Sequence, residues 1–306
     1  MSELPSGTQY EITSGAQRAT IVEVGAGLRK YCVCDRPVLD AFTIHERAEG
    51  GRGQPLLPWP NRIVDGQYEF DGQSFQLPVD EVPLHNAIHG LTRWQNWSLL
   101  EQAPGHVRFG LTLHPRPGYP FLLELEIDYS LDAGGLKVRT TARNRGERRL
   151  PFGAGQHPYF TVGTPRVDQA TLQFAAASRL EMDPERLVPT GAVLTTAGTS
   201  FDFRVAREIG DQVLDDCFTE LERDEHGAAH VTLSDPSTGR STTVWMSTEY
   251  QYVQVFTGDT LAPDKRRIGL AIEPMTCPPN AFRTGMDLIV LDPQEVLSLE
   301  WGIKTT

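Results

Sequence analysis

Residues 121–132 read FLLELEIDYSLD, and this stretch decides the fold class. Its odd-numbered positions are all apolar, whereas the even-numbered positions from 124 onward are acidic or polar. This period of two predicts a β-strand with one buried face. Residues 136–145, LKVRTTARNR, alternate in the same way with a basic outer face, and DAGG at 132–135 predicts the hairpin turn. We expect ion pairs between the acidic and the basic face.

The same alternation recurs along most of the chain, and long amphipathic helices are hard to find. The intervening loops are rich in Gly, Pro, Asp and Asn, and no linker divides the chain. The sequence therefore predicts an all-β fold, a large antiparallel β-sandwich with few short helices, formed by residues 1–306 as a single domain. Further strands are expected at residues 107–113, 231–233, 243–245, 252–256, 268–272 and 297–303.

Composition narrows the functional class. The 306 residues include 28 Gly and 22 Pro, which is rich in turns but below the roughly 25–30% that marks low-complexity disorder. A formal net charge of −12 argues against a nucleic-acid partner, which needs a basic face, and against an anionic membrane surface. We therefore expect a protein that binds or converts a small molecule.

The protein is expected to be cytoplasmic. The sequence has no apolar run long enough for a transmembrane helix, and residues 1–15 lack the basic and apolar regions of a secretory signal. Cys32 and Cys34 would share one face of a strand, where disulfides seldom form, and Cys217 and Cys277 stand alone. Four free thiols agree with a reducing compartment.

Motifs for nucleotides, metals and serine nucleophiles are missing. The sequence contains no P-loop, no complete G-x-G-x-x-G, no G-x-S-x-G and no H-E-x-x-H. His85 and His89 are four residues apart, but Gly90 and the turn-rich surroundings argue against a helical metal pair. We expect neither a cofactor nor a metal.

Two predicted strands combine an apolar face with a face of small residues that ends in one ionisable side chain. In residues 150–159 that side chain is His157, and in residues 268–274 it is Glu273. Glycine inside a strand often marks a place where a ligand comes close. A proline follows each ionisable residue and holds it extended. We expect these residues to clear space in front of His157 and Glu273 or to stiffen the chain behind them: Gly153, Gly155, Gly269, Pro158 and Pro274.

A histidine and a carboxylate are the natural pair for general acid–base chemistry near neutral pH. Taken singly, either residue at a strand end is more often structural, so the match between the two strands is what favours a site. Most of the aromatic residues belong in a core by default, but one or two are suited to stack on a sugar ring. Further polar candidates, which also fit surface charges or solvated turns, are Asn61, Arg62, His89, Asp215 and Asp216.

Five segments, taken together, resemble the aldose 1-epimerase (galactose mutarotase) family. They occur in the family's order and are spread along the chain. The resemblance implies a β-supersandwich of the galactose mutarotase type. The segments are Asn61-Arg62-Ile63, His89-Gly90-Leu91, Gln156-His157-Pro158-Tyr159-Phe160, Asp215 with Phe218 three residues later, and Glu273 near the end of a late strand.

The resemblance also implies roles for individual residues. His157 is similar to the general acid that protonates the ring oxygen of an aldose, and Glu273 to the general base that takes the proton of the C1 hydroxyl. We expect His157 to be protonated and Glu273 ionised before the reaction. Asp216 is an alternative to Asp215, but only Asp215 has Phe218 at the family's spacing. The residues expected to hold the sugar are Arg62, His89, Asp215, Asn61 and Tyr159.

Residues 273–280, EPMTCPPN, depart from the galactose-specific members. They are more similar to a bacterial branch, some members of which are thought to act on modified hexoses, including a sulfosugar. The resemblance thus implies a mutarotase, which interconverts the α and β anomers of a hexose through the open-chain aldehyde and needs no cofactor or metal. Its partner is a small aldose sugar, and we expect a monomer or a homodimer.

Three alternatives stay open at this stage. The first is a mutarotase for an anionic hexose, carrying a phosphate or a sulfonate, which would require a further basic residue such as Arg93 or Arg283. The second is a carbohydrate-binding protein without catalytic activity. The third is a glycoside hydrolase on the same sandwich, which usually needs two carboxylates rather than a histidine and a glutamate.

Overall fold

Strand β12 (Leu123–Asp132) and strand β13 (Gly135–Asn144) form the predicted hairpin in the computed structural model, which describes residues 4–306. The antiparallel register runs from Leu123 opposite Asn144 to Asp132 opposite Gly135. The apolar side chains of β12 are buried, and its acidic face is half-buried. Glu124 Oε1 lies 3.5 Å from Arg143 Nε across the strands. The hairpin and the cross-strand ion pair are thus confirmed.

The hairpin belongs to the largest sheet, which has nine strands. Every pairing in it is antiparallel, which agrees with the alternating pattern of the sequence. Its strand order is β10 (Ser98–Ala103), β11 (His106–Leu113), β12, β13, β27 (Val296–Thr305), β23 (Ser241–Met246), β22 (Ala229–Ser234), β17 (Thr171–Phe174) and β20 (Arg207–Glu208).

A second sheet, of eight strands, carries the segments with the ionisable strand ends. Strand β16 (Tyr159–Phe160) pairs with β25 at one side of the main path. The order along that path is β19 (Pro189–Thr195), β18 (Ala176–Met182), β21 (Asp215–Leu221), β24 (Tyr252–Phe256), β25 (Leu270–Met275), β15 (Gly155–Gln156) and β5 (Pro55–Leu56).

Smaller elements complete the fold. A four-stranded sheet runs in the order β1 (Gln9–Ser14), β2 (Gln17–Val22), β3 (Leu28–Val33) and β4 (Arg36–Pro37). Three strand pairs are β6 (Arg62–Val64) with β9 (Asn86–Ile88), β7 (Gln67–Phe70) with β8 (Gln73–Gln76), and β14 (Leu150–Phe152) with β26 (Ile289–Leu291). The helical segments are the short 3-10 helices η1 (Val82–Leu84) and η2 (Val167–Gln169) and the single turn α1 (Ala281–Thr284).

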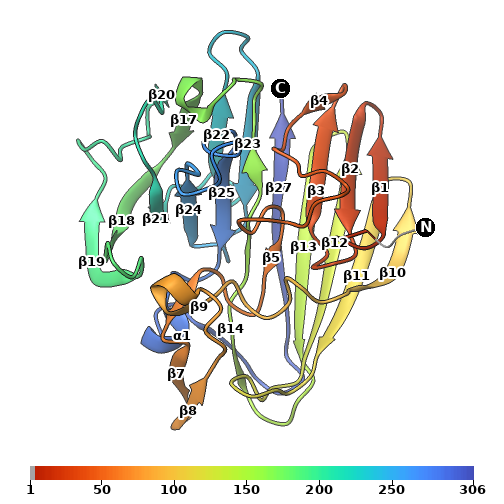
Figure 1. Ribbon diagram of the computed structural model, residues 1–306, viewed down its shortest axis with the longest axis vertical. Coiled ribbons are helices and arrows are strands. Elements are labelled where there is room, and N and C mark those ends of the chain that lie inside the picture. Colours follow the sequence, from red (N-terminus) through yellow and green to blue (C-terminus); the bar gives the residue numbers. More distant parts are fainter. Residues whose placement is uncertain (1–3) are drawn as a thin grey trace.

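The sheets stack in layers (Figure 1). The four-stranded sheet covers one half of the nine-stranded sheet, where β1 and β2 contact β11 and β12. The eight-stranded sheet lies in front of the other half, over β22 and β23 (Figure 1). One continuous apolar core contains residues of all three sheets, among them Ile21, Leu125 and Ile272. The predicted all-β sandwich with few short helices is therefore confirmed.

One predicted strand is wrong in its extent. Residues 150–159 form three short pieces, β14, β15 and β16, instead of one strand. Pro158 separates the last two, because proline has no backbone N–H to donate to a ladder. Residues 150–159 are buried on both faces, so their apolar face and their small-residue face do not separate the core from solvent.

The glycines of these segments serve packing and not the space in front of the ionisable residues. A β-carbon at Gly153 would lie 2.5 Å from Cys277 Sγ, and one at Gly155 would lie 2.8 Å from Pro60 Cβ. At Gly269 it would meet Asp40 at 2.8 Å. These positions therefore let chain segments approach one another closely, and the expectation that they clear a ligand site is wrong.

All four cysteines are free, as expected from their positions, and Cys34 alone of them is exposed. Between residues 4 and 306, no helix is long and apolar enough to cross a membrane.

Candidate active site

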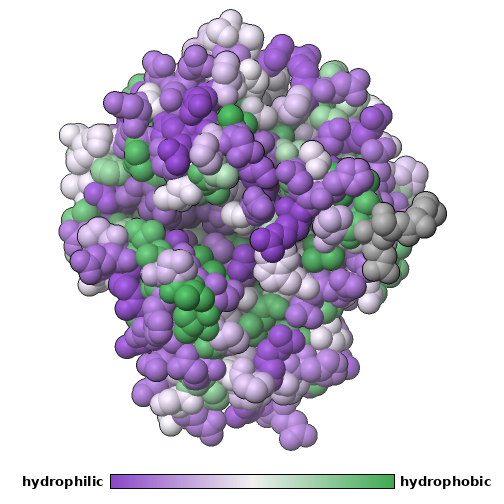
Figure 2. All heavy atoms as spheres, viewed as in Figure 1, coloured by the Kyte–Doolittle hydropathy of each residue, from purple (hydrophilic) through white to green (hydrophobic). Residues whose placement is uncertain are grey.

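A cavity of about 620 Å³, lined by both charged and apolar side chains, opens beside the eight-stranded sheet. Figure 2 shows a hollow in this face of the molecule, with hydrophobic side chains gathered next to it. Strands of the sheet form its floor, and loops from the first hundred residues form much of its wall. All seven residues expected to act on or hold a sugar line this one cavity: Asn61, Arg62, His89, His157, Tyr159, Asp215 and Glu273.

Sheet register brings His157 and Glu273 together. Gly155 pairs with Met275 in strands β15 and β25, and Tyr159 pairs with Ala271 in strands β16 and β25. His157 lies halfway between the first members of these pairs, and Glu273 lies halfway between the second. The two residues are therefore opposite each other although Pro158 interrupts the ladder, and side chains at opposite positions project from the same face of a sheet.

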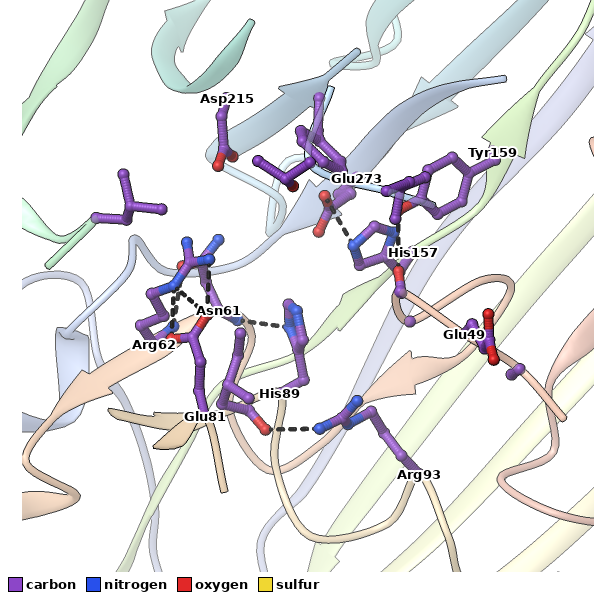
Figure 3. Close-up of a pocket in the computed structure, with 18 of the residues that line it drawn as sticks. Glu49, Asn61, Arg62, Glu81, His89, Arg93, His157, Tyr159, Asp215 and Glu273 are labelled. Carbon is purple, nitrogen blue, oxygen red and sulfur yellow. Dashed lines mark hydrogen bonds and ion pairs between the residues drawn. The ribbon is translucent and has the colours of Figure 1, made fainter. Parts of the chain in front are cut away.

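The two side chains touch inside the cavity. His157 Nε2 lies 3.3 Å from Glu273 Oε1, and both side chains are buried (Figure 3). Within residues 4–306, neither His157 Nδ1 nor Glu273 Oε2 has a hydrogen-bond partner. Buried polar atoms in proteins are normally satisfied, so two unpartnered atoms on one contacting pair are unusual and favour a functional role for it.

Burial favours the neutral form of both groups. Desolvation lowers the pKa of His157 to about 3, and the nearby guanidinium groups of Arg93 and Arg52 act in the same direction. Desolvation raises the pKa of Glu273 well above its ordinary value, and the Asp215 carboxylate adds to this effect. Burial therefore favours neutral His157 and protonated Glu273, which is the reverse of the expected resting state.

His89 lies across the cavity from the pair, with its ring centroid 5.3 Å from that of His157. The backbone N–H of Asn61 donates a hydrogen bond of 3.2 Å to His89 Nδ1, which must therefore be unprotonated. Burial lowers the pKa of His89, so the ring is neutral and carries its proton on Nε2. Nε2 is thus a hydrogen-bond donor for a ligand.

Arg62 is held rigidly by an acidic partner that the sequence did not reveal. Its Nε donates to both carboxylate oxygens of Glu81 at 3.0 and 2.9 Å, and its Nη2 donates to Oε1 at 2.9 Å. Asn86 Nδ2 in turn donates to Glu81 Oε2 at 2.9 Å. A guanidinium fixed by such a fork presents its remaining N–H groups in a defined direction.

Asp215 reaches the cavity from the first position of β21. Gln254 Nε2 in the neighbouring strand β24 donates to Asp215 Oδ1 at 2.6 Å, and burial raises the pKa of the Asp215 carboxyl. Asp216 forms an ion pair of 3.0 Å with Arg179 and does not line the cavity. The structure therefore favours Asp215 over the alternative Asp216.

Tyr159 supports the histidine. Its ring stacks on His157 with 5.0 Å between the centroids and an interplanar angle of 15°. The Tyr159 hydroxyl donates to the Gly50 carbonyl at 2.9 Å, and the Arg52 guanidinium lies 4.4 Å from the ring centroid. Tyr159 thus lines the cavity and also fixes the orientation of the His157 ring.

Glu81 lines the cavity, but it had no clear signal in the sequence. Glu81 belongs to an acidic doublet with Asp80, which would not by itself be distinguished from surface charge. Arg93 lines the cavity, and its Nη2 lies 3.3 Å from Asp80 Oδ2. Arg283, the other basic candidate, lies outside this cavity and 3.7 Å from Asp65.

His85 and His89 do not form a metal pair. His85 is exposed and lies 2.9 Å from Asp65, whereas His89 faces the cavity. In the part of the chain that the structure describes, no group of three or more His, Cys, Asp or Glu side chains is arranged to hold a metal ion.

The fold is that of the galactose mutarotase-like β-sandwich proteins. A solved structure of an aldose epimerase homologue from C. elegans superposes with a TM-score of 0.88, at 20% identity, over 98% of each chain. Sequence comparison gives the family. The chain belongs to the aldose 1-epimerase family, whose model matches residues 8–304.

Two relatives illustrate the range of similarity within this family. The Escherichia coli (strain K12) protein named "Uncharacterized protein YihR" is 35% identical over 288 residues, which cover 94% of this chain and 90% of that protein. The galactose mutarotase of Rattus norvegicus is 31% identical over 226 residues, which cover 68% of this chain and 65% of that protein.

Proposed function

We propose that this protein is an aldose 1-epimerase that interconverts the α and β anomers of an aldohexose. The observation that carries the proposal is the buried contact between His157 and Glu273, which line the same cavity and each have one buried polar atom without a hydrogen-bond partner among residues 4–306. One group that can donate a proton and one that can accept it, held side by side, are what ring opening and closing of an aldose require.

Ring opening uses the pair in its charged form. The Glu273 carboxylate takes the proton of the C1 hydroxyl while protonated His157 gives its proton to the ring oxygen, and the bond between C1 and the ring oxygen breaks. The products are the open-chain aldehyde, protonated Glu273 and neutral His157. No electron or group is transferred.

Ring closure uses the pair in its neutral form. After rotation about C1–C2, His157 takes the proton of the C5 hydroxyl and Glu273 donates its proton to the carbonyl oxygen, which gives the other anomer. This neutral form is the one that burial favours. A single proton that crosses the 3.3 Å contact between Oε1 and Nε2 therefore converts one working form into the other.

The rest of the lining suits the hydroxyl groups of a sugar. Asp215 is an acceptor, Arg62 and the Nε2 of His89 are donors, and Asn61 fixes His89 through its backbone. Tyr159 keeps the His157 ring in place. We propose that these five residues bind and orient the sugar while His157 and Glu273 move protons.

The first candidate substrate is a neutral hexose, in line with the galactose mutarotase named among the relatives. One observation favours a second candidate, an anionic hexose. Arg93 lines the cavity, and within the described residues its Nε is buried and has no hydrogen-bond partner. A guanidinium with a free N–H at a cavity wall is suited to a phosphate or a sulfonate.

Polarimetry tests the proposal. Freshly dissolved α-glucose, α-galactose and glucose 6-phosphate are followed with the wild-type protein and with Glu273→Gln and His157→Asn. We expect the wild type to accelerate mutarotation of at least one sugar and each variant to lose about 10²–10⁴-fold. Wild-type protein that accelerates none of them, or full activity in both variants, would sink the proposal.

A control pair separates the two candidate substrates. Arg93→Gln removes the cavity guanidinium, whereas Arg283→Gln removes one outside the cavity. A loss in kcat/KM for glucose 6-phosphate but not for glucose, seen only in Arg93→Gln, supports the anionic hexose. Equal effects on both sugars support the neutral one. Release of reducing sugar from a disaccharide, or binding without any acceleration, would instead indicate the hydrolase or the binding protein.

A further inference from the structure

Trp245 lies on the outer face of the nine-stranded sheet, which is turned away from the apolar core. Val244 and Met246, the neighbours of Trp245 in β23, are fully buried, so the indole projects from the opposite face. The side chains of this outer face are mostly charged or polar along β12, β13 and β27. A half-buried tryptophan among them departs from the alternation that the sheet otherwise follows.

Gly302 gives the indole its place on the sheet. Trp245 pairs with Gly302 across the ladder between β23 and β27. A β-carbon at position 302 would lie 2.6 Å from Nε1 and 2.7 Å from Cε2 of Trp245. The indole therefore lies against the bare backbone of β27, and it forms part of the floor of a groove of about 490 Å³, here called the outer groove.

Three turns at one end of the sheet form the walls of the outer groove. They are the β12–β13 turn at residues 132–135, the segment 224–228 before β22 and the segment 247–249 after β23. Arg223 joins two of these turns, because its Nη1 donates to the carbonyls of Gly227 at 3.0 Å and of Ser247 at 3.1 Å. In the third turn, the Gly134 N–H donates to Asp132 Oδ1 at 2.7 Å. The walls are thus preorganised for a ligand.

The polar lining of the outer groove suits neutral hydroxyl groups. Its carboxylates and amines belong to Asp132, Asp224, Glu249, Glu300, Lys137 and Lys304. Glu300 is held by Arg139 at 2.6 Å and Asp224 by His230 at 2.7 Å, and each carboxylate has further lone pairs that accept hydrogen bonds. The surplus of carboxylates and the net charge of −12 disfavour an anionic ligand, whereas the two lysines disfavour a cationic one.

We infer that the outer groove is a second carbohydrate site, which binds a chain of neutral pyranose rings on Trp245 without acting on it. The rigid apolar face of the indole fits the C–H face of a pyranose, and the surrounding carboxylates and lysines fit its hydroxyl groups. Among residues 4–306, none lines both the outer groove and the candidate active-site cavity. Binding here needs no free anomeric hydroxyl, so the inference does not depend on the proposed function.

Calorimetric titration with the methyl glycoside of a trisaccharide of 4-linked glucose tests the inference, because a blocked anomeric carbon prevents mutarotation. The proteins are the wild type, Trp245→Ala, Trp245→Phe and the control Leu100→Ala, which truncates an exposed side chain of β10 outside both sites. We expect Trp245→Ala to weaken binding about 3- to 10-fold, Trp245→Phe to recover part of the loss and Leu100→Ala to bind like the wild type. No binding by the wild type, or equal binding by wild type and Trp245→Ala, would overturn the inference.

Chemical protection of the wild-type protein keeps the test decisive if Trp245→Ala does not fold. Tryptophans are oxidised with N-bromosuccinimide with and without the trisaccharide glycoside, and the modified positions are located by mass spectrometry. We expect the glycoside to slow oxidation of Trp245 and to leave Trp94 unprotected, which is 51% exposed at the active-site cavity. Protection of Trp94 without Trp245 would place the glycoside in that cavity and overturn the inference. Equal protection of Trp245 by a trisaccharide of galacturonic acid would overturn the neutral ligand class.

Discussion

The backbone of Gly51 lies against the ring of His157 so closely that a β-carbon at position 51 would be 2.6 Å from Cδ2 of the histidine. Gly51 also has a φ of +73°, in the left-handed region. The ring therefore contacts both this backbone and the stacked ring of Tyr159, whose centroid lies 5.0 Å away. His157 has little freedom to turn, and its orientation depends on the absence of a side chain at position 51.

Gly51→Ala should therefore reduce activity far more than it reduces stability. Gly15→Ala is a matched control, because Gly15 has a φ of +57° and a β-carbon there would meet nothing within 4 Å among residues 4–306. Both variants should lose about 1–2 kcal/mol of unfolding free energy from the left-handed backbone. Only Gly51→Ala should lose at least about tenfold in kcat, measured by polarimetry beside thermal unfolding. Equal activity in the two variants would contradict the role of Gly51.

The two members of the proposed catalytic pair, His157 and Glu273, should behave as one unit. His157→Asn and Glu273→Gln should each lower kcat by about 10²–10⁴-fold, because either change stops the same proton exchange. The double variant should be no worse than the more damaged single variant, since residues that act together are not additive. Independent losses that multiply in the double variant would show that the residues act in separate steps.

The pH profile should lack an acid limb at the ordinary pKa of histidine. The pair works while it holds one proton. A second proton joins it only below the pKa of His157, which burial lowers to about 3, and the single proton leaves only above the raised pKa of Glu273. kcat/KM should therefore stay high as the pH falls through about 6.5 and decline on the alkaline side. An acid limb centred near the ordinary histidine value would show that His157 titrates as an exposed residue.

Glu81→Gln should weaken sugar binding more than it slows the chemistry. The change removes the negative charge that fixes Arg62 through three hydrogen bonds. A guanidinium that is free to move binds a hydroxyl less well, so KM should rise about fivefold to tenfold with a smaller change in kcat. Glu69→Gln, on an exposed position of the hairpin β7–β8, is the control. A fall in kcat with unchanged KM would mean that Glu81 takes part in proton transfer.

The alternation of apolar and polar residues made individual strands predictable. It could not show which residues of neighbouring strands lie opposite each other. The alternation at residues 121–132 gave β12 and its buried face correctly, because a period of two is a property of one strand. The contact between His157 and Glu273 depends instead on which residues of β15, β16 and β25 face each other. These strands come from two segments more than a hundred residues apart, and the composition of either segment does not indicate which residues will pair.

Glycine was the residue type whose role was misread. Gly153 and Gly155 lie in the same segment as His157 and invited a local explanation, but they serve close packing against Cys277 and Pro60. The glycine that shapes the site, Gly51, comes from a loop far away in the sequence. The same holds for Glu81, whose pairing with Arg62 arises when β6 and β9 come together.

The residues proposed to transfer protons and those proposed to bind the sugar are positioned by different parts of this fold. His157 and Glu273 are set by the hydrogen-bonded ladder around β25, where a shift of that strand by one residue would turn Glu273 away from His157. Arg62, Glu81, Arg93 and Trp94 belong to the early segments that wall the cavity. Under the proposed function, substrate preference is therefore open to redesign by grafting the loops at residues 47–51 and 81–94 from one relative to another, while the proposed proton transfer is retained with the sheet.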